Sequence, residues 1–293
     1  MSDKIIKALA ADDSIRIIAA ETTGLVSAAS KIHKCSPTAS AAFGRLLTAA
    51  SIMGSMLKSE SDSITVKIDG GGKAGSITAT SYSDGHVKGY IGNPFVELMV
   101  NDKGKFDIGK AVGKNGFVTV IKDLGLKEPY IGKVPIYSGE IAEDIAYYFA
   151  VSEQVPSAVG LGVLVDKDCS IKKAGGFIIQ MLPESSKETA DLLTERLSKM
   201  TGITNLLSKG NTIEDIVKDI FKDMNIRKID EMIPEYRCDC SREKVEKALI
   251  SIGKKELSDI YMDNKEEEIK CNFCEKSYKF THEEIGKILK NMN

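Results

Sequence analysis

The chain has 293 residues, 42% hydrophobic and 28% charged, and its 40 basic and 42 acidic residues leave a formal net charge of −2. This near-neutral balance argues against a protein that mainly binds nucleic-acid backbone, and no apolar run approaches the length of a membrane-spanning helix. A chain of this length usually exceeds one small core, so we expect a soluble globular protein of more than one domain.

The first residues do not resemble a signal peptide. They lead into a polar amphipathic stretch that contains Asp12 and Asp13. Free cysteines at metal-binding spacing, in a chain that shows no export signal, are typical of a reducing compartment. We therefore expect a cytoplasmic protein.

Residues 1–182 are rich in glycine and in short alternating segments. Ser36 and Pro37 read as the N-cap and first position of a long helix that runs to Met56. A later helix is expected over residues 139–151. Strand-like segments joined by turn signals predict an antiparallel meander and two further buried strands: 64–68, 75–80, 87–91, 117–121, 131–137, 159–165 and 177–182. Strands in runs with inserted helices predict an α+β domain.

Residues 183–233 read as a helical linker. Ser185 with Glu188, and Thr212 with Asp215, have the spacing of capping boxes before two amphipathic helices. The apolar faces of these helices comprise Leu193, Leu197, Ile213, Ile216, Val217, Ile220 and Phe221. Helices this short are marginal in water, so they must dock on a neighbouring domain and form the weak point of the chain.

Residues 234–293 predict a third, small domain. A helix is expected from Ser241 to Ile252, a hairpin from Ile269 to Phe280, and a last helix capped by Thr281. About sixty residues can form only a small hydrophobic core, so an additional stabilising cross-link is expected.

Four cysteines in this domain predict a metal site. Cys238-x-Cys240 and Cys271-x-x-Cys274 are two close pairs separated by residues 241–270, and each pair can supply two ligands from one short turn. Such a site typically holds Zn²⁺. His282 follows closely enough to replace a ligand, but the four cysteines already complete a tetrahedral shell.

Two chemical interpretations of the four cysteines remain open from spacing alone. A structural zinc ion would contribute about 10–16 kcal/mol and thus much of the folding energy of the domain. Alternatively, metal-bound thiolates could react with peroxide or hypochlorous acid, form disulfides and lose the metal. Pairing within each motif, Cys238 with Cys240 and Cys271 with Cys274, is the local option among three possible connectivities.

The chain resembles the heat shock protein 33 family of redox-regulated chaperones over essentially its whole length. The Cys-x-Cys and Cys-x-x-Cys pairs near the C-terminus match the family signature position for position. Four segments of the N-terminal part are also similar to blocks of that family: Gly89–Pro94, Lys122–Tyr130, Ser152–Ala158 and Ala174–Gln180.

The resemblance implies a fold and a function. It implies an N-terminal α+β domain (1–182), a metastable helical linker (183–233) and a C-terminal zinc-binding redox domain (234–293). The reduced zinc form would be inactive. Oxidation of the four cysteines would release zinc, unfold the last domain and the linker, promote homodimerisation and let the protein hold unfolding clients without ATP. The seven apolar linker residues are then the candidate client-binding residues.

Two other functions compete with this hypothesis. A constitutive zinc-ribbon module that binds nucleic acid or protein is expected to have a basic face. Here Lys244 and Lys247 alternate with Glu243 and Glu246, so the charge near the cysteines is close to neutral. In a thiol-disulfide oxidoreductase the first cysteine of the Cys-x-x-Cys motif lies at a helix N-terminus, whereas Cys271 is expected in a hairpin. We therefore expect no catalytic residues, no nucleic-acid or membrane partner, and unfolded proteins as clients.

Overall fold

The computed structural model describes residues 2–102, 104 and 106–292, and the chain forms two compact units that divide after Arg237. Helices and strands are mixed in both units, which confirms the predicted α+β class. Residues 183–233, expected as a linker, are part of the first unit. Within the described residues, no helix is both long and apolar enough to cross a membrane.

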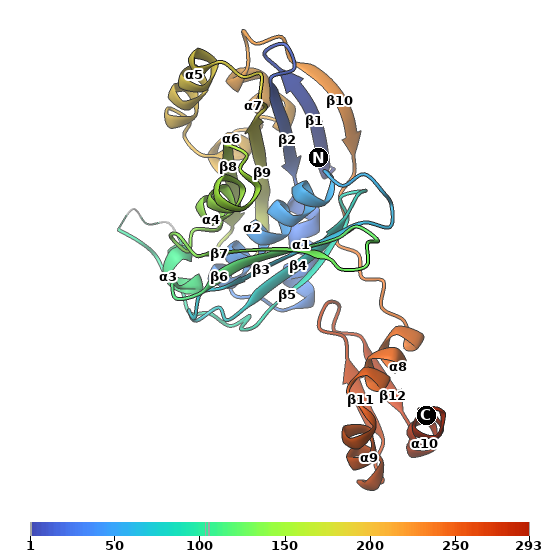
Figure 1. The fold of residues 1–293 in the computed structure, drawn as a ribbon. Helices are drawn as coiled ribbons and strands as arrows, with labels where there is room; N and C mark the ends of the chain where they lie inside the picture. Colours follow the sequence, from blue (N-terminus) through green and yellow to red (C-terminus); the bar gives the residue numbers. More distant parts are fainter. Residues whose placement is uncertain (1, 103, 105, 293) are drawn as a thin grey trace. The chain divides into compact units, whose positions relative to one another are not determined.

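The first sheet of the first unit has five antiparallel strands in the order β10-β1-β2-β9-β8 (Figure 1). The strands are β1 (Lys4–Ala10), β2 (Ile15–Glu21), β8 (Ser157–Val165), β9 (Ile171–Met181) and β10 (Arg227–Met232). The sequence did not predict β1, β2 or β10. Strand β10 is an exposed edge strand of mostly charged residues, so its conformation comes from pairing with β1.

This sheet is buried on both faces. In β2, Ile15 and Ile17 belong to a cluster on the outer face, while Ile18 and Ala20 belong to the main core on the other face. Side chains alternate between faces along a strand, so two-sided burial turns alternation into a continuous apolar run. The alternation of apolar and polar residues that marks a strand is therefore not visible in the sequence of β2.

The second sheet is also antiparallel, in the order β5-β4-β3-β6-β7. Its strands are β3 (Ser63–Asp69), β4 (Ile77–Tyr82), β5 (Val87–Ile91), β6 (Phe117–Asp123) and β7 (Tyr130–Pro135). All five had been predicted from their alternation. The predicted meander, in which each strand pairs with the next along the chain, was wrong in one connection, because β6 pairs with β3 and not with β5.

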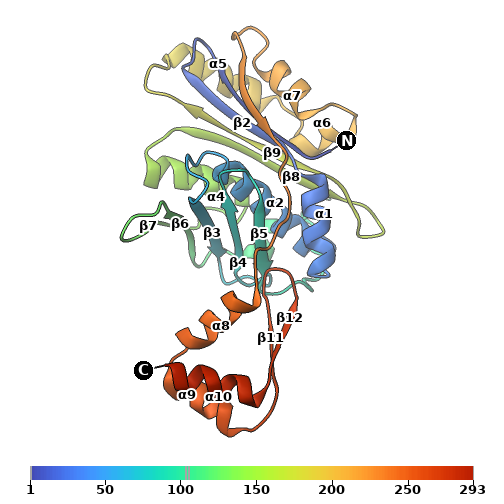
Figure 2. The ribbon, with the colours of Figure 1, turned by 90° about the vertical axis from the view of Figure 1, so that its right-hand side faces the viewer.

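Helix α2 (Pro37–Gly54) lies between the two sheets (Figure 2) and confirms the predicted long helix. Nearly every residue of α2 is buried, and its many small side chains let other elements approach closely. A Cβ atom at Gly44 would lie 2.5 Å from a methyl carbon of Val26. The remaining helices around this core are α1 (Thr23–Ile32), α3 (Ile108–Val112), α4 (Ile141–Tyr148) and the π-helical turn η1 (Phe149–Glu153).

Three helices cover the outer face of the first sheet (Figure 1): α5 (Lys187–Ser198), α6 (Ile203–Ser208) and α7 (Ile213–Ile220). Helix α7 begins with the predicted capping box of Thr212 and Asp215. The cap predicted at Ser185 was wrong by one residue. Ser186 caps α5, because the Ser185 hydroxyl donates instead to the Ser14 carbonyl at 2.6 Å. Helix α6 was not predicted.

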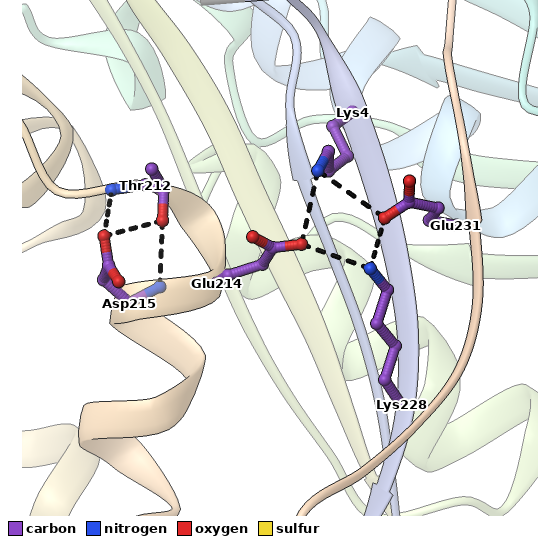
Figure 3. A network of polar contacts seen from close by, with 6 residues as sticks. All are labelled: Lys4, Thr212, Glu214, Asp215, Lys228 and Glu231. Carbon is purple, nitrogen blue, oxygen red and sulfur yellow. Dashed lines mark hydrogen bonds and ion pairs between the residues drawn. The ribbon is translucent and has the colours of Figure 1, made fainter.

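A network of four charges joins α7, β1 and β10 (Figure 3). Lys4 Nζ lies 3.3 Å from Glu214 and 3.5 Å from Glu231, and Lys228 contacts the same two carboxylates. Partial desolvation opposes ionisation of Glu214, but hydrogen bonds from Lys228 and Lys4 lower its pKa below the ordinary 4.5. A hydrogen bond from Lys228 likewise lowers the pKa of Glu231.

Acid is expected to loosen this attachment. A carboxylate whose pKa is depressed by folding stabilises the fold above its unfolded pKa, and this stabilisation is lost as the pH falls through the folded pKa. Hydrogen exchange of β10, corrected for intrinsic rates, should therefore show easier opening at about pH 3.5 than at about pH 6. Glu214→Gln should reduce that pH dependence, whereas Glu60→Gln, which lies outside the network, should leave it unchanged. Equal pH dependence in Glu214→Gln would contradict the role of the network.

The second unit is a hairpin flanked by three helices: α8 (Arg242–Ser251), α9 (Lys254–Met262), β11 (Glu267–Lys270), β12 (Ser277–Phe280) and α10 (His282–Asn291). The predicted hairpin and both predicted helices are confirmed, including the Thr281 capping box, while α9 was not predicted. The core is small: Val245, Leu249, Leu257, Tyr278, Phe280, Ile285 and Ile288.

Candidate metal centre

The four predicted cysteines come together in the second unit. Cys238 and Cys240 lie in an extended segment just before the Ser241 cap of α8, and Cys271 and Cys274 lie in the turn between β11 and β12. Their four sulfur atoms all lie within 4.8 Å of one another, and each residue is half-buried. The spacing therefore predicted the juxtaposition correctly.

Backbone hydrogen bonds fix the turn that carries the second pair. The Cys271 amide donates to the Lys276 carbonyl at 2.9 Å, and the Glu275 amide donates back to the Cys271 carbonyl at 2.8 Å. Glu275 adopts a positive φ of 63°, which closes the turn. Pairing of Lys270 with Ser277 holds the base of the turn in register, so both sulfurs project from a rigid frame.

The sulfur geometry fits a tetrahedral metal ion. A zinc–sulfur bond of about 2.3 Å gives a tetrahedron whose sulfur–sulfur edges are about 3.8 Å. The Cys238 and Cys271 sulfurs are 3.7 Å apart, and those of Cys240 and Cys274 are 3.3 Å apart. His282 is outside the cluster, where its ring stacks on Tyr261 with centroids 4.0 Å apart. The donor set is thus four thiols.

Burial raises the pKa of Cys238 well above its ordinary value of 9.0, and it also raises the pKa of Cys274. Partial burial acts in the same direction at Cys240, but hydrogen bonds from Tyr278 and the neighbouring thiols lower its pKa to about 7. Cys240 therefore ionises more readily than Cys238 or Cys274, and a thiolate is both the better ligand and the better nucleophile.

Tyr278 is a site residue that sequence reasoning missed. Its hydroxyl donates to the Cys240 sulfur, with an oxygen–sulfur distance of 3.1 Å, and its ring belongs to the small core. That hydrogen bond raises the pKa of Tyr278, because losing the phenol proton would place two negative charges side by side. The only sequence signal was an aromatic residue at an inward strand position beside the turn.

Tyr278→Phe is expected to weaken zinc binding about tenfold, because hydrogen bonds to a ligand atom typically contribute that much to metal affinity. Competition with a chromophoric chelator would measure the change, with circular dichroism to show that the unit stays folded. Tyr261→Phe, which alters a tyrosine stacked on His282, is the matched control and should retain full affinity. Unaltered affinity in Tyr278→Phe would contradict a role for its hydroxyl.

The other two cysteines belong to the first unit and are not members of the cluster. Cys35 is half-buried, and burial raises its pKa to about 12. Cys169 is exposed in a turn where it adopts a φ of 66°.

The seven candidate client-binding residues all contribute to one apolar cluster on the outer face of the first sheet. Six are buried and Leu197 is partly buried. They pack on strand residues such as Ile17 and Phe177. In this structure they are ordinary packing residues, so they become available only if α5–α7 leave the sheet.

The short segment before Cys238 is anchored to the first unit. The Val87 amide donates to the Glu235 carbonyl and the Arg237 amide donates to the Val87 carbonyl, each at 3.0 Å. The Tyr236 hydroxyl donates to the Gly89 carbonyl at 2.7 Å and lies 3.0 Å from His33 Nε2. The chain is therefore held to β5 up to the residue before the first ligand.

The chain is thus an α+β protein whose small C-terminal unit brings together four cysteine sulfurs that could hold a metal ion. Comparison with known proteins then identifies the family. The model of the family described as Hsp33 protein matches residues 3–281, and the chain belongs to this family.

Curated relatives agree over the full length. The chain is 61% identical to the 33 kDa chaperonin of Clostridium novyi (strain NT) over 292 residues, covering 100% of this chain and 99% of that protein. It is also 61% identical over 290 residues to the 33 kDa chaperonin of Clostridium perfringens (strain SM101 / Type A), covering 99% and 92% of the two chains. The crystal structure of the 33 kDa chaperonin of Thermotoga maritima matches with a TM-score of 0.89 at 36% identity, covering 99% of both chains.

Proposed function

We propose that this protein is a redox-regulated chaperone that holds unfolding proteins without ATP and has no catalytic residues. The observation that carries the proposal is the convergence of four cysteine sulfurs within 4.8 Å in a unit whose core is small. Membership of the Hsp33 family and the chaperonin names of its curated relatives support the chaperone part. The cysteine chemistry supports the redox part.

In the reduced state, Cys238, Cys240, Cys271 and Cys274 would hold Zn²⁺. Four thiolates are a donor set that favours zinc among the common divalent ions, and the sulfur spacing suits tetrahedral coordination. When bound, the ion would cross-link the segment before α8 to the β11–β12 turn and keep the sulfurs deprotonated. A structural zinc site contributes about 10–16 kcal/mol in small domains, which exceeds what a core of this size supplies.

Oxidation would remove these ligands. One thiolate of a pair attacks a peroxide oxygen, which breaks the oxygen–oxygen bond, releases hydroxide and leaves the sulfur as a sulfenic acid. The second thiolate then attacks that sulfur and displaces a second hydroxide to form the disulfide. Two pairs thus consume two equivalents of peroxide. We propose Cys238–Cys240 and Cys271–Cys274 as the disulfides. The short sulfur distances in the assembled site run across the two motifs, so the competing pairs are Cys238–Cys271 and Cys240–Cys274.

Loss of the ligands would unfold the second unit and destabilise the segment that precedes it in the sequence. Strand β10 ends at Met232, and the anchored residues 235–237 lead directly to Cys238, so unfolding of the second unit would leave a mobile chain immediately after this segment. Helices α5–α7 are held by one apolar cluster, and α7 also by the ion pair of Glu214 with Lys228 of β10. Their detachment would expose the seven candidate client-binding residues and a complementary strip on the sheet, which would also promote homodimerisation.

This proposal is tested by following zinc and chaperone activity in the same sample. Peroxide is added to the reduced zinc form, a chromophoric chelator reports released zinc, and aliquots are assayed for holding of a thermally unfolding client. We expect zinc release, disulfide formation and holding to rise together, with peptide mapping to show the two local disulfides. Holding that precedes zinc release, or that oxidation leaves unchanged, would favour a permanent zinc-ribbon module instead.

A further inference from the structure

The first unit contains a cavity of about 400 Å³ that the proposed redox switch does not use. It lies between the two sheets, where the end of α2 and the π-helical turn η1 approach residues of β2, β3, β6 and β9. Three of the four segments that carry the family resemblance contribute to its wall: Lys122–Tyr130, Ser152–Ala158 and Ala174–Gln180. A volume of this size is typical of small-molecule sites.

Arg16 lies at one end of the cavity. Arg16 donates from Nε at 3.0 Å and from Nη2 at 2.5 Å to the same oxygen of Gln180, which is itself 1% exposed. Among the described residues, no carboxylate forms an ion pair with Arg16. Burial lowers its pKa, yet a guanidinium stays protonated near neutral pH. A partly buried cation held by a neutral amide is the arrangement expected of an anion-binding group.

The other charges of the cavity balance one another, which leaves the single positive charge of Arg16. Lys122 Nζ lies 2.6 Å from Glu153, whose carboxylate also accepts a hydrogen bond from the Tyr148 hydroxyl. Asp62 accepts from the Ser59 amide at 3.1 Å and offsets the charge of the exposed Lys58 at the rim. The lining therefore has three cations against two anions.

The rest of the wall is apolar and fixed in place. Met53, Ile64 and Phe149 are buried and line the cavity together with Met56, Leu57 and Val155. Phe149 begins the π-helical turn, which ends at Gln154 in the left-handed conformation with a φ of 57°. Single π-helical turns occur frequently at functional sites, and a non-glycine residue with positive φ is uncommon.

We propose that this cavity binds a small organic monoanion, with its carboxylate on Arg16 and an apolar body against Met53, Ile64 and Phe149. One net positive charge and an apolar wall select an amphipathic monocarboxylate over a multiply charged metabolite such as a nucleotide. This inference is independent of the redox switch, because none of the lining residues belongs to the second unit or to α5–α7.

Octanoate is the probe, tested on the full reduced chain with zinc by titration calorimetry and saturation-transfer NMR. We expect saturable one-to-one binding with a dissociation constant of about 1 mM or tighter. Octanol, which lacks the charge, should bind at least tenfold more weakly, as should octanoate to Arg16→Gln. Arg227→Gln, at an exposed arginine on β10, is the matched control and should bind octanoate normally.

A second variant separates binding from folding. Leu124 lines the cavity and is 40% exposed, so Leu124→Trp can fill the space without disturbing the core. This variant should keep its thermal stability and lose octanoate binding. No saturable binding up to about 10 mM, or undiminished binding in both Arg16→Gln and Leu124→Trp, would overturn the proposal.

Discussion

Cys271→Ser is expected to abolish tight zinc binding and to leave residues 238–293 largely unfolded even under reducing conditions. A serine hydroxyl is a poor zinc ligand, so the variant forfeits most of the about 10–16 kcal/mol that a structural zinc contributes. The seven buried residues of this unit cannot replace that stabilisation. Zinc content by mass spectrometry and limited proteolysis would measure both effects.

Cys169→Ser is the matched control for this experiment. Cys169 is an exposed cysteine of the first unit, outside the sulfur cluster, so its variant should bind zinc and resist protease like the parent chain. Full zinc occupancy with unchanged protease resistance in Cys271→Ser would count against the four-cysteine site.

Leu207→Ala is expected to loosen α5–α7 without any oxidation. Leu207 is fully buried in the outer cluster and packs so closely on β9 that a Cβ atom at Gly175 would lie 3.0 Å from it. Removing a leucine from such a site costs about 2–5 kcal/mol. The reduced zinc form of this variant should therefore suppress client aggregation in part, and hydrogen exchange over residues 187–220 should accelerate. The variant does not alter any of the seven candidate client-binding residues.

The control for this prediction is Ile229→Ala on β10. Ile229 lies on the edge strand of the sheet, outside α5–α7, and is 53% exposed, so its truncation should change stability by no more than about 0.5 kcal/mol. If Leu207→Ala loosened α5–α7 in hydrogen exchange and still failed to hold clients, the proposed link between detachment and activity would be wrong.

The sequence predicted most strongly where local chemistry decides structure. Thr212 with Asp215 and Thr281 with Glu284 form the capping boxes that their spacing predicted, and the five strands of the second sheet were visible as alternating segments. The four cysteines were visible because a metal site needs ligands at short, recognisable spacings. In each case the signal lies within a few residues.

The missed features depend on tertiary context. Strand β2 is buried on both faces and shows no alternation, and β10 is a charged segment that becomes a strand only by pairing with β1. The docking of α5–α7 on the sheet could not be read from their apolar stripes, which fit either neighbouring domain. Tyr278 and Arg16 act through residues distant in sequence, Cys240 and Gln180, so no local pattern marks them.

Light scattering of a heat-labile client tests the proposed switch most directly. The protein would be assayed reduced with zinc, after peroxide at mildly raised temperature, and again after a reductant and zinc are restored. We predict suppression of aggregation by the oxidised sample alone, with loss of that suppression on re-reduction. Equal suppression, or none, in the reduced and oxidised samples would contradict the switch and leave the four cysteines as a permanent structural site.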